Sequence, residues 1–269
     1  MKTIDHCMIV WLVLLIMSST FMISFSHDEF LLVLMKLRLG LLNRDLADRF
    51  NISIGLVSQI FTSLLAAMDK TIGTLVFWPT KEQVLATRPD RYKNTPSLVA
   101  IIDCSEIFIE TPKNLDLQYL TYSNYKGHNT LKFLVGIAPN SAITFLSPLY
   151  CGRVSDKALT LHCGFLDIVE PYDEIMADKG FNISRECAER NIYLRVPPGK
   201  RGASQMAPAD LSHTKIVANV RILVEQIIRR MKTFRYIKYE MPISALKTAD
   251  QALRVIAGLC NLDYPMYQD

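Results

Sequence analysis

The stretch Leu98-Val99-Ala100-Ile101-Ile102-Asp103 decides the fold class. Five consecutive apolar residues that end in a carboxylate are typical of a strand buried on both faces of a sheet. A second expected strand, residues 174–177, ends in the same way at Asp178. Because ligands of open α/β sheets gather at the carboxyl ends of the strands, the two aspartates are predicted to share a site.

Alternating strands and helices are expected around these two segments. Residues 107–109 continue in extended form after Asp103, and residues 131–137 and 142–146 flank a Pro-Asn-Ser turn as a hairpin. Another strand is expected over 192–196. Helices are expected over 157–169 and 213–234. This order predicts an α/β fold, a sheet with helices on its faces.

A small all-α module is predicted before the sheet, over residues 28–70. It comprises helices over 30–42, 44–50 (capped by Asn43) and 54–68 (capped by Ser53). The last two are joined by a tight turn, which is the pattern of a helix-turn-helix. The second of them exposes Ser and Thr side chains and has no Arg or Lys before Lys70, so both a DNA-reading role and a plain packing role stay open. Residues 71–97, rich in Pro, predict a linker with little regular structure.

Length and composition predict a folded protein. The 269 residues are 50% hydrophobic and 21% charged, which excludes a disordered tail or a collagen-like repeat. The length suits one large domain, or a medium domain with a small companion. The net charge of +4 is unevenly spread: +2 over residues 1–97, −5 over 98–178 and +7 over 179–269. The basic end hints at a polyanionic partner.

The first residues, 1–27, form an apolar leader with no charged side chain from Cys7 to Ser26. Three interpretations stay open: a membrane-spanning helix, a secretory signal peptide, or a gene-model artefact. The six cysteines contain no C-x-x-C pair and fit neither a zinc knuckle nor a disulfide framework. They are expected to be buried or incidental thiols in a reducing compartment.

The helix expected over 213–234 offers a third carboxylate. An apolar stripe predicts the face that packs on the sheet: Val217, Val220, Val224, Ile227 and Met231. At 100° per residue, a second group of residues falls within ~80° on the adjoining face: Arg221, Glu225, Arg229 and Lys232. Pairing at i,i+4 on a solvated surface explains this group simply. However, residues 195–238 hold ten basic and only two acidic side chains. Three carboxylates in a basic surround are what two-metal phosphodiester chemistry requires.

Several sequence blocks together resemble a known family. They are Val99-Ala100-Ile101-Ile102-Asp103-Cys104-Ser105-Glu106, Ser123-Asn124-Tyr125-Lys126-Gly127-His128-Asn129-Thr130-Leu131-Lys132, Gly152-Arg153-Val154-Ser155-Asp156-Lys157, Ala177-Asp178-Lys179-Gly180-Phe181 and Arg221-x3-Glu225-x6-Lys232. In this order they resemble the DDE superfamily of transposases and endonucleases, particularly the PIF/Harbinger-like members. The resemblance covers roughly residues 28–262, with a nuclease domain expected over 98–262.

The resemblance implies an RNase H-like fold: a mixed five-stranded sheet whose first and fourth strands carry the aspartates, flanked by helices and preceded by a helix-turn-helix. Asp103, Asp178 and Glu225 are then the catalytic residues and the ligands of divalent cations, two Mg²⁺ or Mn²⁺ ions. DNA phosphates are assigned to Lys126, Lys132, Arg221, Arg229 and Lys232. The implied activity is hydrolysis or strand transfer at DNA phosphodiester bonds. DNA is the implied partner, with a DNA-binding partner protein and a homodimer as further expectations.

Some positions depart from the family pattern. Lys179 stands where the family usually has Arg, Cys151 where Gly is common, and Ala218 where related bacterial enzymes carry Tyr. Lys179 keeps the charge but loses a bidentate grip on phosphate. The alternative is therefore a domesticated, non-catalytic DNA-binding or scaffold protein that retains the fold. The family implies a nucleus, whereas the apolar segment 7–26 would instead fit a membrane or secretory signal.

Overall fold

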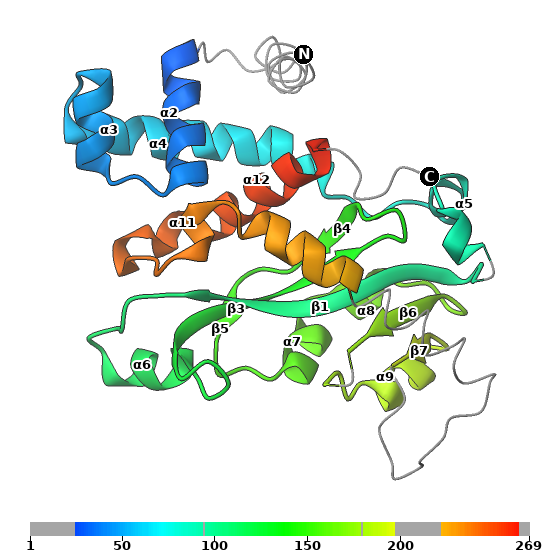
Figure 1. Cartoon of the computed structure of the whole chain (residues 1–269). Helices are drawn as coiled ribbons and strands as arrows, with labels where there is room; N and C mark the ends of the chain where they lie inside the picture. Colours follow the sequence, from blue (N-terminus) through cyan, green and yellow to red (C-terminus); the bar gives the residue numbers. More distant parts are fainter. Residues whose placement is uncertain (1–24, 94, 179, 197–221, 264–269) are drawn as a thin grey trace. The chain divides into compact units, whose positions relative to one another are not determined.

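The computed structural model describes residues 25–93, 95–178, 180–196 and 222–263, which belong to two compact units (Figure 1). The helical unit gathers Met1–Val76, Ile107–Glu110 and Arg230–Tyr264. The sheet unit gathers Phe77–Glu106, Thr111–Arg229 and Pro265–Asp269. Most of the apolar leader, Arg221 and the first half of the long predicted helix lie outside the described residues.

The predicted helix-turn-helix is confirmed in the helical unit, as α2 (His27–Leu39), α3 (Asn43–Phe50) and α4 (Ile54–Thr71). The first helix begins earlier than predicted because Ser26 and Glu29 form a reciprocal capping box. Asn43 is the first residue of α3 and not its cap. Ser53 caps α4 as predicted, accepting a 3.1 Å hydrogen bond from the Leu56 amide.

The C-terminal helices also belong to the helical unit. They are α11 (Arg235–Lys238), η3 (Ile243–Thr248) and α12 (Ala249–Leu262). The guanidinium of Arg254 on α12 donates two 2.7 Å hydrogen bonds to the carboxylate of Asp69 on α4. Contacts thus group this segment with the helix-turn-helix, whereas the sequence analysis assigns it to the nuclease domain. The division into domains stays a prediction.

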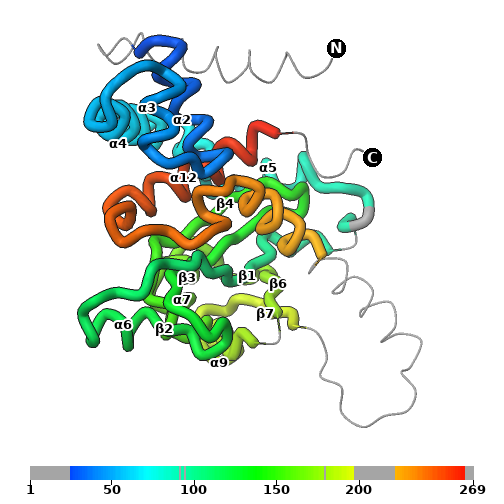
Figure 2. The backbone as a smooth tube through the Cα atoms, turned by 60° about the vertical axis from the view of Figure 1, so that its left-hand side comes forward, coloured from blue at the N-terminus to red at the C-terminus, as the bar shows by residue number. Residues whose placement is uncertain are grey.

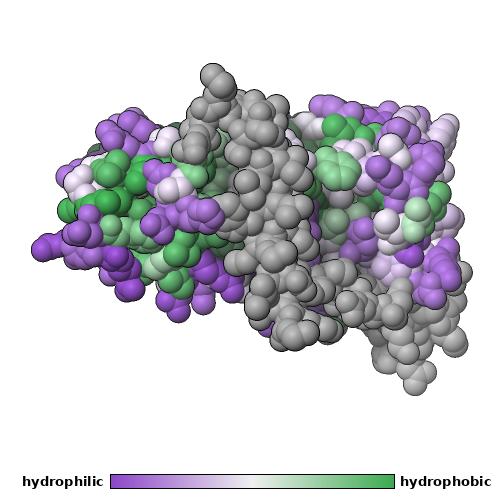
Figure 3. Space-filling view, turned by 90° about the horizontal axis from the view of Figure 1, so that it is seen from above, coloured by the Kyte–Doolittle hydropathy of each residue, from purple (hydrophilic) through white to green (hydrophobic). Residues whose placement is uncertain are grey.

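Apolar side chains also remain on the outside of the helical unit. Figure 3 shows apolar surface at the left, where α2, α3 and α4 lie. The large exposed apolar side chains of this part are Leu31, Leu39, Leu42, Ile54 and Leu56. No single helix of the described part is long and apolar enough to cross a bilayer. Of the described helices, only the bent pair Asn43–Phe50 and Ile54–Leu75, taken together, has the length and apolar composition of a membrane span.

The sheet is mixed, as predicted, and has the RNase H-like order. In the described part it runs β2-β3-β1-β6-β7, with β4 and β5 also paired to β3. The bounds are β1 (Leu98–Phe108), β2 (Tyr122–Ser123), β3 (His128–Ile137), β4 (Ile143–Leu146), β5 (Tyr150–Cys151), β6 (Glu174–Ala177) and β7 (Tyr193–Arg195). Strands β1, β6 and β7 are parallel, and β4 and β5 are antiparallel to β3. The described sheet thus has seven strands and not the five that the resemblance implies, and Asp178 follows the sixth strand and not the fourth. The difference arises because β2 and β5 are short strands of two residues each.

Strand β1 is longer than the sequence predicts. Asp103 lies within it and not at its carboxyl end, because β1 continues through Phe108 with Ile107 fully buried. The parallel partner β6 is shorter and ends at Ala177, which pairs with Ile102. Asp103 and Asp178 therefore each follow the last paired residue of the β1–β6 ladder. The two aspartates share one level of the sheet although only one of them ends a strand.

Helices flank the sheet: α5 (Lys81–Ala86), α6 (Leu115–Thr121), α7 (Asp156–His162), α8 (Phe165–Ile168), α9 (Ser184–Glu189) and a helix over 222–231. The single helix expected over 157–169 is two helices, because Gly164 takes a left-handed conformation (φ 80°) between α7 and α8. The expected linker contains α5, whose Thr80 and Gln83 form a capping box. The helix over 222–231, orange, runs beside β1 in Figures 1 and 2.

The core of the sheet unit lies between the strands and the short helices. The apolar run before Asp103 is buried as predicted, with Ala100, Ile101 and Ile102 at most 1% exposed. Phe165 of α8 packs edge-on against Trp78 and Phe145, with 5.8 and 5.1 Å between ring centroids. Phe165 belongs to the same buried cluster as Ile102 and Ala177, the residues before the two aspartates.

Candidate functional site

Two of the three predicted catalytic carboxylates are placed together by the sheet. Asp103 is partly buried in β1, and Asp178 is partly buried directly after β6. The pairing of Ile102 with Ala177 gives both side chains the same register. The sheet, and not a loop, therefore sets the position of Asp103.

The electrostatics of Asp103 show that further acids lie close to it. Its pKa is raised from 3.8 to about 6, first by burial and then by the charges of Asp178, Asp156 and Glu225. The amide of Cys104 donates a 2.8 Å hydrogen bond to Asp103 Oδ1, which opposes the rise in pKa. Asp103 is thus a carboxylate whose pKa is raised by the charges of three other acids of the sheet unit.

Glu225 reaches this group from the helix over 222–231. Its side chain is exposed, while Val224 and Ile227 on the same helix are buried, as the apolar stripe predicted. Its charge contributes to the raised pKa of Asp103. Asp178 and Glu225 are therefore both close enough to Asp103 for their charges to affect its pKa.

A metal-binding geometry is not formed by these acids in the described part of the chain: no three His, Cys, Asp or Glu side chains there lie close enough to hold one ion. Their chemistry nevertheless fits divalent cations, because carboxylate oxygens are the ligands that Mg²⁺ and Mn²⁺ prefer. The mutual repulsion that raises the pKa of Asp103 is also what a bound cation would relieve.

Sequence reasoning missed a fourth carboxylate, Asp156. It opens α7, where Ser155 caps the helix by accepting a hydrogen bond from the Ala158 amide. Besides acting on Asp103, it lies beside the chain that follows Asp178, since a Cβ added at Gly180 would stand 3.9 Å from Asp156 Oδ2. Asp156 belongs to the Gly152–Lys157 block, one of the sequence blocks that resemble the family.

Lys132, expected to bind DNA phosphate, is instead buried among acids. Its Nζ lies 3.1 Å from Asp156 Oδ1 and 3.6 Å from Glu106 Oε1. The second oxygen of Glu106 accepts a 2.7 Å hydrogen bond from Thr130. Lys132 is only 9% exposed, so this ammonium group neutralises the buried Glu106 and the partly buried Asp156. A role in contacting phosphate stays a prediction.

The other predicted DNA ligands are scattered. Lys126 is exposed and stands over the ring of Tyr125, 4.5 Å from its centroid. Arg229 is exposed on the same helix as Glu225. Lys232 belongs to the helical unit, and Arg221 lies outside the described residues.

The helix-turn-helix has cations nearby that the sequence analysis did not find. Ser58 and Thr62, two of the exposed residues of α4, line a cavity of about 640 Å³ together with residues of the C-terminal segment. Arg235 and Lys247 are among these residues. They are far from α4 in sequence, so local reasoning about the recognition helix could not place them there.

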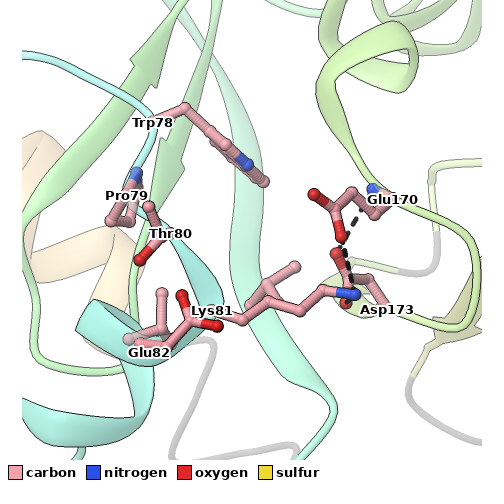
Figure 4. A pocket seen from close by; sticks show the side chains of 9 residues that line it. Trp78, Pro79, Thr80, Lys81, Glu82, Glu170 and Asp173 are labelled. Carbon is pink, nitrogen blue, oxygen red and sulfur yellow. Dashed lines mark hydrogen bonds and ion pairs between the residues drawn. The ribbon is translucent and has the colours of Figure 1, made fainter.

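A second cavity, of about 370 Å³, lies at α5, and its lining includes none of the three predicted catalytic acids (Figure 4). Lys81 spans it and pairs with Glu170 at 2.8 Å and Asp173 at 3.1 Å. Trp78 forms part of its apolar wall. Because two carboxylates neutralise Lys81, we interpret these ion pairs as a structural link between α5 and the loop before β6.

Two family models match the chain. Residues 102–261 match the family model of the DDE superfamily endonucleases, and residues 26–74 match the helix-turn-helix of the same superfamily. The structure is similar at a TM-score of only 0.23 and 13% identity to the crystal structure of a pre-cleavage Mos1 transpososome, over 88% of this chain and 76% of that one. No curated protein matches the sequence. Since the endonuclease model covers more than half of the chain, the protein belongs to the DDE superfamily of endonucleases.

Proposed function

We propose that the protein is a metal-dependent DNA nuclease of the transposase type, which hydrolyses DNA phosphodiester bonds or transfers DNA strands. The observation that carries this proposal is the placement of Asp103 and Asp178 at one level of the sheet, directly after the paired residues Ile102 and Ala177. Burial, and then the charges of Asp178, Asp156 and Glu225, raise the pKa of Asp103 there. Partly buried acids that lie close together at one level of two parallel strands are costly unless cations compensate them.

In this proposal Asp103, Asp178 and Glu225 hold two Mg²⁺ or Mn²⁺ ions. When bound, such a pair activates a water or a DNA 3′-hydroxyl and stabilises the leaving oxygen. Asp103 supplies a carboxylate oriented by the Cys104 amide within a buried strand. Glu225, being exposed on its helix, supplies the ligand that is open to a DNA backbone.

Asp156 and Lys132 then act as positioning residues. The ion pair between them ties the start of α7 to β3, directly beside Asp103. Because Lys132 neutralises part of the local negative charge, it limits the repulsion that Asp103 experiences before a cation binds.

The proposed substrate is DNA, held at two places. The helix-turn-helix presents Ser58 and Thr62 beside Arg235 and Lys247, which supply the phosphate contacts that α4 itself lacks. Arg229, on the helix of Glu225, adds a cation at the acids. A DNA substrate also favours the nucleus as the location.

The experiment is a plasmid-nicking assay with Mn²⁺ or Mg²⁺, comparing the wild type with Asp178→Asn. We expect nicking by the wild type only, and none in EDTA, with unchanged circular dichroism. Arg185→Gln is the matched control, because its exposed side chain pairs only at i,i+4 with Glu189. Metal-dependent nicking by Asp178→Asn would contradict the assignment.

A non-catalytic scaffold is the second candidate. It is favoured by the absence of a preformed metal cluster among the residues that the structure describes. Calorimetric titration with Mn²⁺ separates the two, since the nuclease requires binding that Asp103→Asn abolishes, whereas the scaffold requires none.

A further inference from the structure

Helix α6, the following β2 and the turn over residues 124–127 present large apolar and aromatic side chains to solvent. Six of them are between 40% and 84% exposed: Leu115, Leu117, Tyr119, Leu120, Tyr122 and Tyr125. Within α6 itself only Thr121 is buried. A seven-residue helix is not stable by itself, so contacts other than apolar burial must hold it in place.

Polar contacts supply that support. Asn114 caps α6 by accepting hydrogen bonds from the amides of Asp116 and Leu117. The side chain of Asn129 on β3 donates two 2.8 Å hydrogen bonds, to the carbonyl of Gln118 and the hydroxyl of Thr121. The exposed rings therefore stand on a fixed support, and binding to them would require little ordering of the backbone.

Cations are stacked on these rings. The guanidinium carbon of Arg153 lies 3.8 Å from the centroid of Tyr119, and the Arg153 amide donates a hydrogen bond to the carbonyl of Leu120. Lys126 covers Tyr125 in a similar way. Tyr119 and Tyr125 nevertheless remain 60% and 84% exposed. Each of the two rings thus has a cation beside it and still has surface that is exposed to solvent.

The charge of this surface favours a polyanion over an apolar protein partner. Residues 111–128 together with Arg153 hold three Lys or Arg side chains and one acid, Asp116. The loop of Arg153 also leads, three residues later, to Asp156, whose charge acts on Asp103. A ligand on this surface would therefore lie along the chain segment that borders the acids.

We propose that this tyrosine surface, formed by Tyr119, Tyr122, Tyr125, Lys126 and Arg153, binds unpaired bases of single-stranded DNA. Exposed rings accept any base by stacking, and cations on the rings neutralise the phosphates between the bases. The choice of DNA rests on the proposed function, but the binding itself needs no metal.

The test measures binding of the full chain in EDTA by fluorescence anisotropy. The probes are a labelled single-stranded oligonucleotide of mixed sequence and the duplex of the same sequence. The double variant Tyr119→Ala with Tyr125→Ala should bind the single strand about 5- to 150-fold more weakly for each stacked base that is lost. Duplex binding should change far less, because the helix-turn-helix is intact in both proteins.

Two further variants make the result specific. Tyr193→Ala removes a ring of matched exposure, 58%, from β7 and should leave both affinities unchanged. Tyr119→Phe keeps the stacking face and should bind like the wild type. Equal single-strand affinity of the double variant and Tyr193→Ala overturns the proposal. An equal loss of affinity for single strand and duplex in the double variant also overturns it. The same holds if the double variant changes from dimer to monomer in light scattering without losing affinity for the single strand.

The metal chemistry is tested separately. Asp178→Asn should bind the single strand as the wild type does, because Asp178 is not part of the tyrosine surface. Failure of nicking with intact single-strand binding would therefore contradict the nuclease only, and the reverse result would contradict the tyrosine surface only.

Discussion

Lys132 on β3 and Asp156 at the start of α7 form an ion pair behind the three acids, with 3.1 Å between Nζ and Oδ1. The side chain of Lys132 is 11% exposed, and Glu106, its other carboxylate partner, is 6% exposed. This lysine therefore neutralises one carboxylate with little access to water, Glu106, and one that is partly exposed, Asp156, whose charge acts on Asp103.

Replacing Lys132 by Met should destabilise the fold. The variant leaves Glu106 buried without its cation, and breaking a buried pair in this way costs about 3–5 kcal/mol of unfolding free energy. The measurement is urea unfolding followed by circular dichroism. Lys93→Met removes an exposed partner of Asp90 and should cost no more than about 1 kcal/mol. Similar losses of unfolding free energy in both variants would show that the ion pairs of Lys132 contribute no more to stability than an exposed pair does.

The raised pKa of Asp103 predicts a pH-dependent stability in EDTA. Between pH 3.8 and about 6 the folded chain retains a proton on Asp103 that the unfolded chain has released. The unfolding free energy should therefore fall as pH rises through this window, by about 1–3 kcal/mol, and this contribution should be constant above it.

Asp103→Asn isolates this effect, because the amide keeps an oxygen for the Cys104 hydrogen bond but has no charge. Relative to the wild type, it should gain stability as pH rises from about 4 to 6. Urea unfolding at several pH values provides the comparison, and parallel curves for the two proteins would contradict it. At pH 7, added Mn²⁺ should raise the unfolding temperature of the wild type but not that of Asp103→Asn.

Gly152→Ala should distort the loop that carries Arg153 and Asp156. A Cβ at Gly152 would stand 2.7 Å from the Thr121 carbonyl oxygen and 2.8 Å from that of Thr130, both backbone atoms. Neither can move without disturbing α6 or β3, so we expect a loss of about 2 kcal/mol or more. Gly55→Ala, in the open first turn of α4, should be neutral or stabilising by up to about 1 kcal/mol. Thermal unfolding of both variants checks this expectation.

The parts of the fold that depend on local pattern could be predicted from the sequence. The apolar run before Asp103 is buried, the hairpin forms, and Ser53 caps α4. The position of Asp103 inside β1, level with the end of β6, could not be predicted, because it depends on pairing with a strand far away in the chain. Gly164 did carry a local signal, a left-handed residue that separates α7 from α8, but the apolar spacing on both sides of it concealed the break.

The same limit applies to the site. Three acids could be named from strand ends and from one helix face, since each is marked by its own neighbours. The roles of Lys132 and Asp156 depend on a contact between β3 and α7, 24 residues apart, and sequence spacing does not report whether a lysine faces phosphate or a buried carboxylate. Their assignment required the three-dimensional structure.

The cations beside α4 give the last prediction. Arg235 and Lys247 line the same cavity as Ser58 and Thr62, and phosphate contacts by such side chains release counterions from DNA. The variant Arg235→Gln with Lys247→Gln should therefore bind duplex DNA more weakly and show a shallower dependence of log affinity on log salt, by about 0.9 for each lost contact. Anisotropy titrations at several salt concentrations measure both quantities. The control variant Lys93→Gln with Arg185→Gln removes the same charge from the sheet unit. It should keep the wild-type salt slope if α4 and the C-terminal segment form one DNA-binding surface. An identical change of slope in both double variants would mean that net charge alone, and not this surface, governs binding.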